Sequence, residues 1–219
     1  MWNRKNWVLD MRFLLAVFSL GLAQLAFGQD LLSSLLEAVR MNDTKTVQER
    51  ISQGMSPDTS DPQGNTLLMI AAREGHAEMV RSLLGRNASV RYRNSVGDTP
   101  LMFAALGGVI DIASSLISRG AEIDPTGWTP LHYCAWAGKL PMCQYLIDRG
   151  ANIDAQSPNG TTPLMMAVRG GHLEVVKLLV WEVADLTFRN QDNATALQWA
   201  IGAEREDIVA HLRTAGAKE

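Results

Sequence analysis

This 219-residue chain contains few cysteines and few aromatic residues, and neither acidic nor basic residues are in large excess. Its 2 cysteines are too few for a small scaffold held together by disulfides, and 18 glycines with 8 prolines are too few for a fibrous or disordered polymer. The net charge of -3 argues against nucleic-acid binding, which normally requires a basic surface for the phosphates. The remaining composition, 47% hydrophobic and 20% charged, is that of a folded domain.

The first 28 residues have the pattern of a secretory signal peptide. Basic residues precede an apolar run over residues 13–27, and Ala26 and Gly28 place small side chains where a signal peptidase requires them. The run is shorter than the roughly 20 residues of a membrane-spanning helix, which favours cleavage after Gly28. We therefore expect an exported chain, periplasmic in a Gram-negative host or fully secreted. Retention of residues 1–28 as an uncleaved anchor and a true start at Met11 both stay open.

Removal of residues 1–28 makes the chain more acidic. Without Asp10 and the three basic residues of the segment, 17 basic and 22 acidic residues remain, a net charge of -5. This acidity favours a basic partner over an acidic one.

Residues 29–219 repeat one pattern. Each copy has a glycine or asparagine two residues before a threonine, an apolar alanine-rich segment, a turn centred on glycine and a second apolar segment. The copies begin at Gly64, Gly97, Gly127, Gly160 and Asn193, with spacings of 33, 30, 33 and 33 residues. Recurrence at a fixed period indicates a repeat architecture, and the unit predicts a helix, a turn, a second helix and a loop.

Thr-Pro-Leu-His at Thr129–His132 and its variants in the other copies carry a resemblance to the ankyrin repeat. Threonine caps the free amides of the first helix, proline fits the first helical position, and leucine points into the core. The resemblance implies an all-α solenoid of about six helix-turn-helix units with short hairpin loops. The expected repeats are residues 31–63, 64–96, 97–126, 127–159, 160–192 and 193–219.

Few residues suggest chemistry. His76, His132 and His172 occupy recurring repeat positions, and His211 has no neighbouring Cys, His or carboxylate cluster in the sequence that would suggest a metal site. The sequence has no nucleophile elbow and no phosphate-binding glycine loop. We therefore predict no enzymatic activity, no metal and no cofactor.

Cys134 and Cys143 lie in the paired helices expected for the fourth repeat, where other repeats carry Ala and Val. Two small buried hydrophobic residues explain the pair. A disulfide also stays open for an exported chain, provided that the two Cα atoms are less than about 7 Å apart.

The resemblance implies that a partner protein contacts the hairpin tips and the exposed end of each first helix. Trp128 and Trp136 are unusual at such positions, and together with Leu106 they would form an apolar patch flanked by two arginines. Aromatic residues and arginine often dominate interface energies. The predicted partner-binding residues are Asn65, Arg73, Asp98, Leu106, Trp128, Trp136 and Arg169.

Two features bear on the importance of the fourth repeat. The 30-residue spacing shortens the hairpin before Trp128, which would notch the row of hairpins and expose the indole. The alternative is that both tryptophans pack on neighbouring repeats and only stabilise the stack.

The sequence thus predicts an exported scaffold that binds a protein through its concave face, with no nucleic acid and no membrane contact other than an uncleaved signal. Related exported proteins suggest either support of a periplasmic enzyme or neutralisation of a toxin as an immunity protein. A secreted effector that binds host proteins is the alternative. The identity of the partner and the oligomeric state are not encoded in a recognisable motif.

Overall fold

The computed structural model describes residues 30–218 and is all α-helical in this range. The predicted signal peptide lies outside the described residues. Residues 30–40 are helical and precede α2, and the later helices form five consecutive pairs that each consist of an inner and an outer helix. Their bounds are Thr44–Ser52 (α2), Leu67–Glu74 (α3), Ala77–Gly85 (α4), Pro100–Gly107 (α5), Ile110–Ser118 (α6), Pro130–Trp136 (α7), Leu140–Ile147 (α8), Pro163–Gly170 (α9), Leu173–Trp181 (α10), Ala196–Gly202 (α11) and Glu206–Thr214 (α12).

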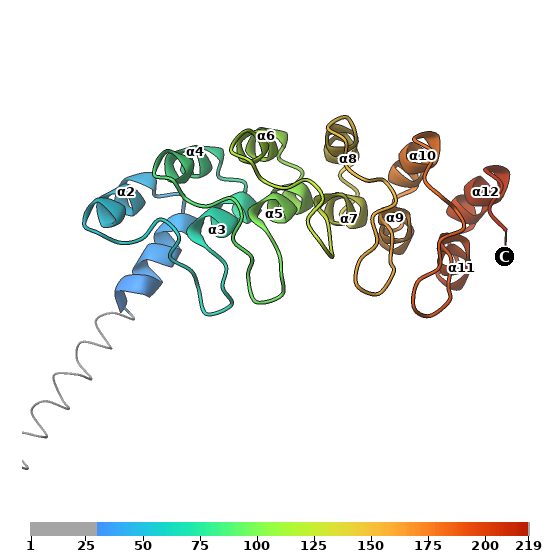
Figure 1. The fold of residues 1–219 in the computed structure, drawn as a ribbon, viewed down its shortest axis with the longest axis horizontal. Helices are drawn as coiled ribbons and strands as arrows, with labels where there is room; N and C mark the ends of the chain where they lie inside the picture. The colour runs from blue at the N-terminus through green and yellow to red at the C-terminus, as the bar shows by residue number, and fades with distance from the viewer. Residues whose placement is uncertain (1–29, 219) are drawn as a thin grey trace, which may run out of the picture.

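The helix pairs stack side by side into an elongated solenoid (Figure 1). The inner helices α3, α5, α7, α9 and α11 form one row, and the outer helices α4, α6, α8, α10 and α12 form the other. Hairpin loops connect each outer helix to the next inner helix and project from one edge of the array. The prediction of an all-α repeat solenoid is confirmed.

Each inner helix begins at the repeat threonine because two hydrogen-bonding devices act there. The threonine is extended and lies at the N-cap. In α3, α9 and α11 its hydroxyl oxygen accepts from the backbone N–H three residues later. In α3, α5, α7 and α11 its own backbone N–H donates to the side chain three residues later. The acceptor is Met69, Met102, His132 or Gln198, at distances of 3.4, 3.3, 3.1 and 2.9 Å. The fourth position of the motif therefore varies in identity while it keeps an acceptor atom.

Small residues let the inner helices approach one another. Ala71, Ala104, Ala135 and Ala167 are fully buried along the row. Larger aliphatic residues such as Leu83, Leu116 and Leu179 fill the space between the inner and the outer rows. The result is one continuous hydrophobic core rather than one core per repeat, as expected for a solenoid.

The structure joins Cys134 of α7 to Cys143 of α8 in a disulfide, with 5.7 Å between the Cα atoms. The two open interpretations of this pair are therefore resolved in favour of the bond, and both cysteines are also fully buried. Inner and outer helices of one repeat face each other at these positions, where other repeats pack Ala against Val. Two cysteines at this contact lie within disulfide reach.

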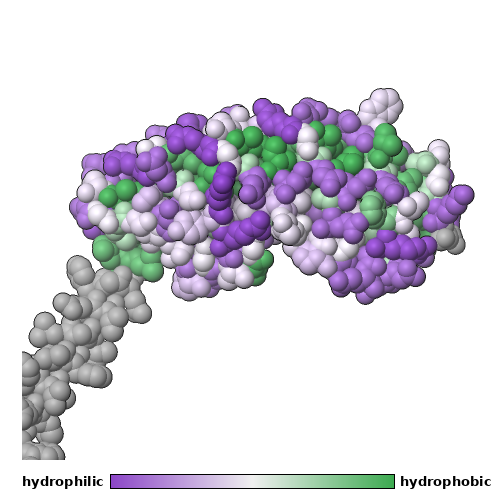
Figure 2. All heavy atoms as spheres, viewed as in Figure 1, coloured by the Kyte–Doolittle hydropathy of each residue, from purple (hydrophilic) through white to green (hydrophobic). Residues whose placement is uncertain are grey.

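The hairpin that precedes α7 is shorter than its neighbours. In Figure 1 it projects less far from the array than the hairpins before α5 and α9, and Figure 2 shows the hairpin edge indented at this place. This matches the indentation expected from the 30-residue spacing. The shortened hairpin carries Trp128, directly before the N-cap Thr129.

Candidate functional site

A cleft opens next to the shortened hairpin, on the inner side of α7 and α9. Its volume is about 320 Å³, and its lining consists of Trp128, Tyr133, Trp136, Met166 and Arg169. Three of these residues, Trp128, Trp136 and Arg169, were predicted from sequence as partner-binding residues. The fold therefore brings the two unusual tryptophans and one of the two predicted arginines into one concave site of the size and composition typical of a binding pocket.

Trp128 forms one wall of the cleft and is only partly exposed. Its ring meets the His132 imidazole edge to face, with 5.2 Å between the ring centroids and an interplanar angle of 79°. The prediction of an exposed Trp128 ring is therefore correct only in part, because His132 covers one side. An aromatic ring held in this way is preorganised for contact.

His132 is fully buried beneath Trp128 and is neutral at physiological pH. Its Nδ1 accepts from the Thr129 backbone N–H at 3.1 Å, and its Nε2 lies 2.9 Å from the Thr161 carbonyl oxygen in the next repeat. Burial lowers the pKa of His132 to about 4, although hydrogen bonds that the ring donates to the carbonyls of Thr161 and Ala155 oppose this shift. One neutral tautomer, protonated on Nε2, satisfies both contacts and links two repeats under the cleft.

Tyr133 forms the floor of the cleft, and Asp98 holds it in place. The tyrosine hydroxyl donates to the Asp98 carboxylate from the preceding repeat. Burial raises the pKa of Tyr133, and the hydrogen bond with Asp98 raises it further, so the hydroxyl stays protonated and remains a donor. Asp98 is only partly exposed and is engaged within the protein, where it fixes the position of an aromatic ring.

Trp136 lines the cleft from the end of α7, with 48% of its surface exposed. Its carbonyl oxygen lies 2.9 Å from Nε2 of His172 in the next repeat. A Cβ atom at Gly170 would lie 2.5 Å from the same carbonyl oxygen, so glycine is required for this close approach. His172 and Gly170 therefore position the backbone that carries Trp136.

Arg169 lies between this cleft and a second hollow of about 380 Å³, which is lined by Arg169, Gln198, Trp199, Gly202 and Ala203. The guanidinium carbon is 6.0 Å from the centre of the Trp199 ring. Among residues 30–218, Arg169 forms no ion pair and no hydrogen bond through its side chain. A cation is thus presented between two aromatic hollows without a carboxylate partner from the described part of the chain.

The family model for ankyrin repeats (3 copies) matches residues 22–126, 87–157 and 149–218. This chain is an ankyrin-repeat protein. No curated protein is similar enough to the chain to count as a match. Ankyrin repeats generally mediate protein–protein interaction and typically act as scaffolds without catalytic activity, so family membership implies a protein partner for this chain.

The other predicted residues of this ankyrin-repeat protein lie outside the cleft. Arg73 on α3 pairs with Glu74 at 3.1 Å, and Leu106 on α5 packs partly buried against the core. Asn65, which was predicted as a partner-binding residue, is buried, with only 8% of its surface exposed. Its side chain donates to Asp61 at 2.9 Å and accepts from Asn94 at 2.8 Å, so it belongs to a hydrogen-bond network between hairpins.

Sequence reasoning missed Tyr133, Met166 and Trp199. All three lie four residues after a repeat threonine, at intervals of 33 residues. The equivalent residues of the earlier repeats, Ile70 and Phe103, are buried. The repeat period identifies these five residues as equivalent. Only the structure shows that the ones in the later repeats, Tyr133, Met166 and Trp199, reach the surface.

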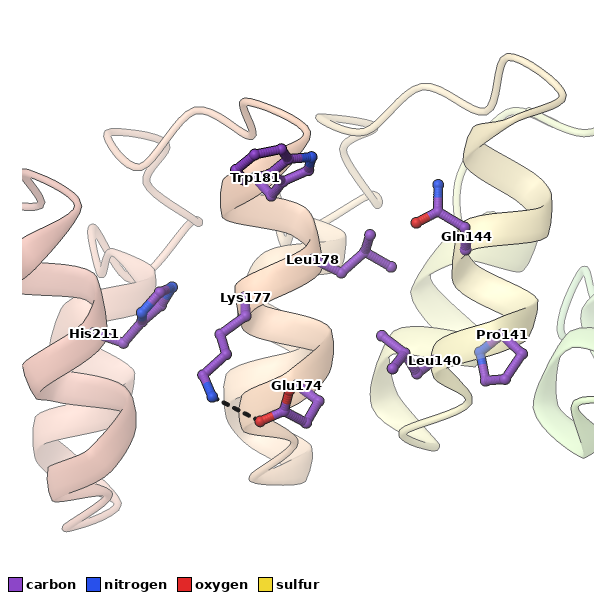
Figure 3. A pocket seen from close by; sticks show the side chains of 8 residues that line it. All are labelled: Leu140, Pro141, Gln144, Glu174, Lys177, Leu178, Trp181 and His211. Atoms are coloured by element: carbon purple, nitrogen blue, oxygen red, sulfur yellow. Dashed lines mark hydrogen bonds and ion pairs between the residues drawn. The ribbon is translucent and has the colours of Figure 1, made fainter.

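A second groove of the ankyrin-repeat protein lies on the opposite, outer row (Figure 3). Its volume is about 590 Å³, and α8, α10 and α12 contribute Leu140, Pro141, Gln144, Glu174, Lys177, Leu178, Trp181 and His211. Trp181 is 83% exposed at the end of α10. Lys177 donates to Glu174 of the same helix at 2.7 Å, so the cation of this groove is neutralised internally.

Two further results concern metal binding and membrane spanning by the described residues. No cluster of three or more His, Cys, Asp or Glu side chains within residues 30–218 is arranged to hold a metal ion. None of the helices in this range is long and apolar enough to cross a membrane.

Proposed function

We propose that this ankyrin-repeat protein is exported and binds a protein partner through the cleft formed by Trp128, Tyr133, Trp136, Met166 and Arg169. The observation that carries the proposal is the convergence of two tryptophans and an unpaired arginine in one concave site. Tryptophan and arginine are the residue types that most often dominate interface energies. The surrounding contacts of His132, Asp98 and His172 hold the site in one arrangement, which lowers the entropic cost of binding.

Two independent features support export. Residues 1–28 have the pattern of a signal peptide, and the described part of the chain carries a disulfide between α7 and α8. Disulfides persist in oxidising compartments such as the bacterial periplasm and are rare in the cytosol. The mass of the chain recovered from the exported fraction tests both features, because cleavage after Gly28 and loss of two hydrogens at the cysteines each change it by a known amount.

Affinity capture from the exported fraction tests the binding site. The wild-type chain is compared with a Trp128→Ala, Trp136→Ala double variant and with Trp181→Ala, which removes an exposed tryptophan from the outer groove. We expect a partner that is lost with the double variant and kept with Trp181→Ala. Equal capture by all three chains would contradict a partner site in the cleft. An enzyme, a toxin or a host protein as the captured partner distinguishes support, immunity and effector roles.

A further inference from the structure

We propose that the partner inserts an apolar side chain into the cleft and presents an adjacent carboxylate to Arg169. This inference rests on the proposed function and specifies the chemistry of the partner. It commits to an acidic, apolar protein segment as the occupant of the cleft.

Arg169 differs from the arginines that lie on the hairpins. Arg93 donates to the carbonyls of Gly97 and Thr126, at 3.4 and 3.3 Å. Arg189 donates to the Asn193 carbonyl at 2.8 Å and to Gln198 at 3.3 Å. The hydrogen bonds of both guanidinium groups therefore stabilise the hairpins. The Arg169 guanidinium has no such partner within residues 30–218, and its five N–H donors remain available to a ligand.

The surroundings of Arg169 favour a carboxylate over water. The walls are the rings of Trp128, Trp136 and Trp199 and the Met166 side chain, so a bound segment would displace water from around the cation. A desolvated charge without a counter-ion is costly, whereas an arginine that meets a carboxylate through two parallel hydrogen bonds is strongly stabilised. Asp98, which holds Tyr133 in place, is engaged by the tyrosine hydroxyl and forms no ion pair with Arg169.

Two more cations extend the positive charge along the turn edge of the same repeats. Lys139 lies against the turn at Gly108, and Arg205 lies against the turn at Gly171. Both side chains are exposed, and neither forms an ion pair within residues 30–218. Arg169, Lys139 and Arg205 therefore lie on or beside the repeats that form the cleft without an ion pair within residues 30–218, although the chain without residues 1–28 carries a net charge of -5. Salt screens the interaction between exposed charges that lie more than about one Debye length, 8 Å, apart. The charges at the contact therefore affect the choice of partner more than the net charge does.

The test uses peptides as probes. A library of random 12-residue peptides displayed on phage is selected on the purified wild-type chain, and binders are then screened against the Trp128→Ala, Trp136→Ala double variant. We expect the peptides that need the tryptophans to be enriched in Asp or Glu next to a large apolar residue. For a synthesised binder, replacement of that Glu by Gln, or Asp by Asn, weakens binding to the wild type about tenfold.

Arg169→Gln distinguishes a contact with Arg169 from a general preference for acidic peptides. The same Glu to Gln replacement is expected to change binding to this variant less than about twofold, because the cation that it addressed is gone. Arg169→Lys keeps the charge and recovers only part of the affinity, since lysine cannot form the two-pronged contact. Arg169 is exposed at the surface, and thermal unfolding of each variant is measured to show that the fold is kept.

The outcomes separate the inference from the proposed function. Peptides that need the tryptophans but show no acidic preference, or whose affinity is unaffected by Arg169→Gln, overturn the carboxylate inference and leave the cleft as the binding site. Selected peptides that bind the tryptophan double variant as well as the wild type overturn both, and so does the absence of any binder above the level of the double variant.

Discussion

The inner cleft and the outer groove of the repeats around α7 to α12 differ in how far the protein itself neutralises the cation that each contains. The outer groove has about 590 Å³ and the inner cleft about 320 Å³, and each contains a highly exposed tryptophan and a cation. In the outer groove Lys177 is neutralised by Glu174, and Trp181 extends into solvent at a helix end (Figure 3). In the inner cleft Arg169 has no counter-ion from the described chain, and hydrogen bonds fix the surrounding groups. The proposed site thus differs from the larger groove in its cation without a counter-ion from residues 30–218 and in its preorganised surroundings.

The largest expected effect concerns His132, the buried histidine on which the inner cleft rests. The unfolded chain takes up a proton at this residue below about pH 6.5, whereas the folded chain does so only near pH 4. The unfolded state therefore binds more protons between these values, and the free energy of unfolding falls by about 3 kcal/mol as the pH is lowered through this window.

Denaturant unfolding from pH 7 to pH 4 checks this prediction against a His132→Gln variant. Glutamine occupies the equivalent position in the last repeat, where Gln198 accepts from its threonine N–H at 2.9 Å. The variant should lose the part of the pH dependence that His132 causes and keep the rest. Parallel curves for the two proteins would show that His132 does not titrate as described.

A comparison of two tryptophans tests the contrast between the surfaces directly. Trp136→Ala in the inner cleft is expected to weaken binding of a captured partner about 100-fold, because a tryptophan at the centre of an interface is typically worth 2 kcal/mol or more. Trp181→Ala in the outer groove should change it less than about twofold. Affinities from isothermal titration of the purified proteins decide the matter, and a larger effect of Trp181→Ala would transfer the site to the outer row.

The disulfide connects the helices that carry the two surfaces, since α7 contributes Trp136 and α8 contributes Leu140. A Cys134→Ala, Cys143→Val variant keeps the residue types of the other repeats at this contact and removes the cross-link. Its free energy of unfolding is expected to fall by about 2–3 kcal/mol, because the unfolded chain gains conformational entropy when the short loop is no longer closed. Denaturant unfolding with and without reductant measures this, and the variant itself should not respond to reductant. Identical curves for the reduced and the oxidised wild type would rule out a stabilising bond.

The smallest expected effect lies beside the outer groove, at Val183. Its φ is 66°, in the left-handed region, where Gly120 and Gly150 occupy the equivalent positions of the preceding repeats. A β-branched residue is strained in this conformation, so Val183→Gly should raise the free energy of unfolding by about 1 kcal/mol. The midpoint of denaturant unfolding reports the change. Binding at the inner cleft should be unaffected, and a loss of affinity would mean that the outer surface takes part in recognition.

Local signals made the fold predictable. A threonine that caps a helix, a proline at its first position and a glycine in the following turn act within a few residues of one another, and their recurrence gives the architecture. The site was predictable only in part. Trp128 and Trp136 were found because tryptophan is unusual at these repeat positions, and Arg169 because it was expected to flank them. Tyr133 and Met166 were not found, because they occupy a row whose members Ile70 and Phe103 are buried in the earlier repeats.

Arg73 and Arg169 show what the sequence by itself determined and what it left to the tertiary structure. The period determined that both lie at the same position of an inner helix, seven residues after the repeat threonine, because helical geometry is set locally. The next residue already separates them, because Glu74 follows Arg73 and pairs with it at 3.1 Å, whereas Gly170 follows Arg169. Only the tertiary structure decided that Arg169 lies between two aromatic hollows and, among residues 30–218, without a counter-ion. The aromatic surroundings of a charge depend on which side chains the neighbouring repeats bring to it, and the period of the sequence does not specify that.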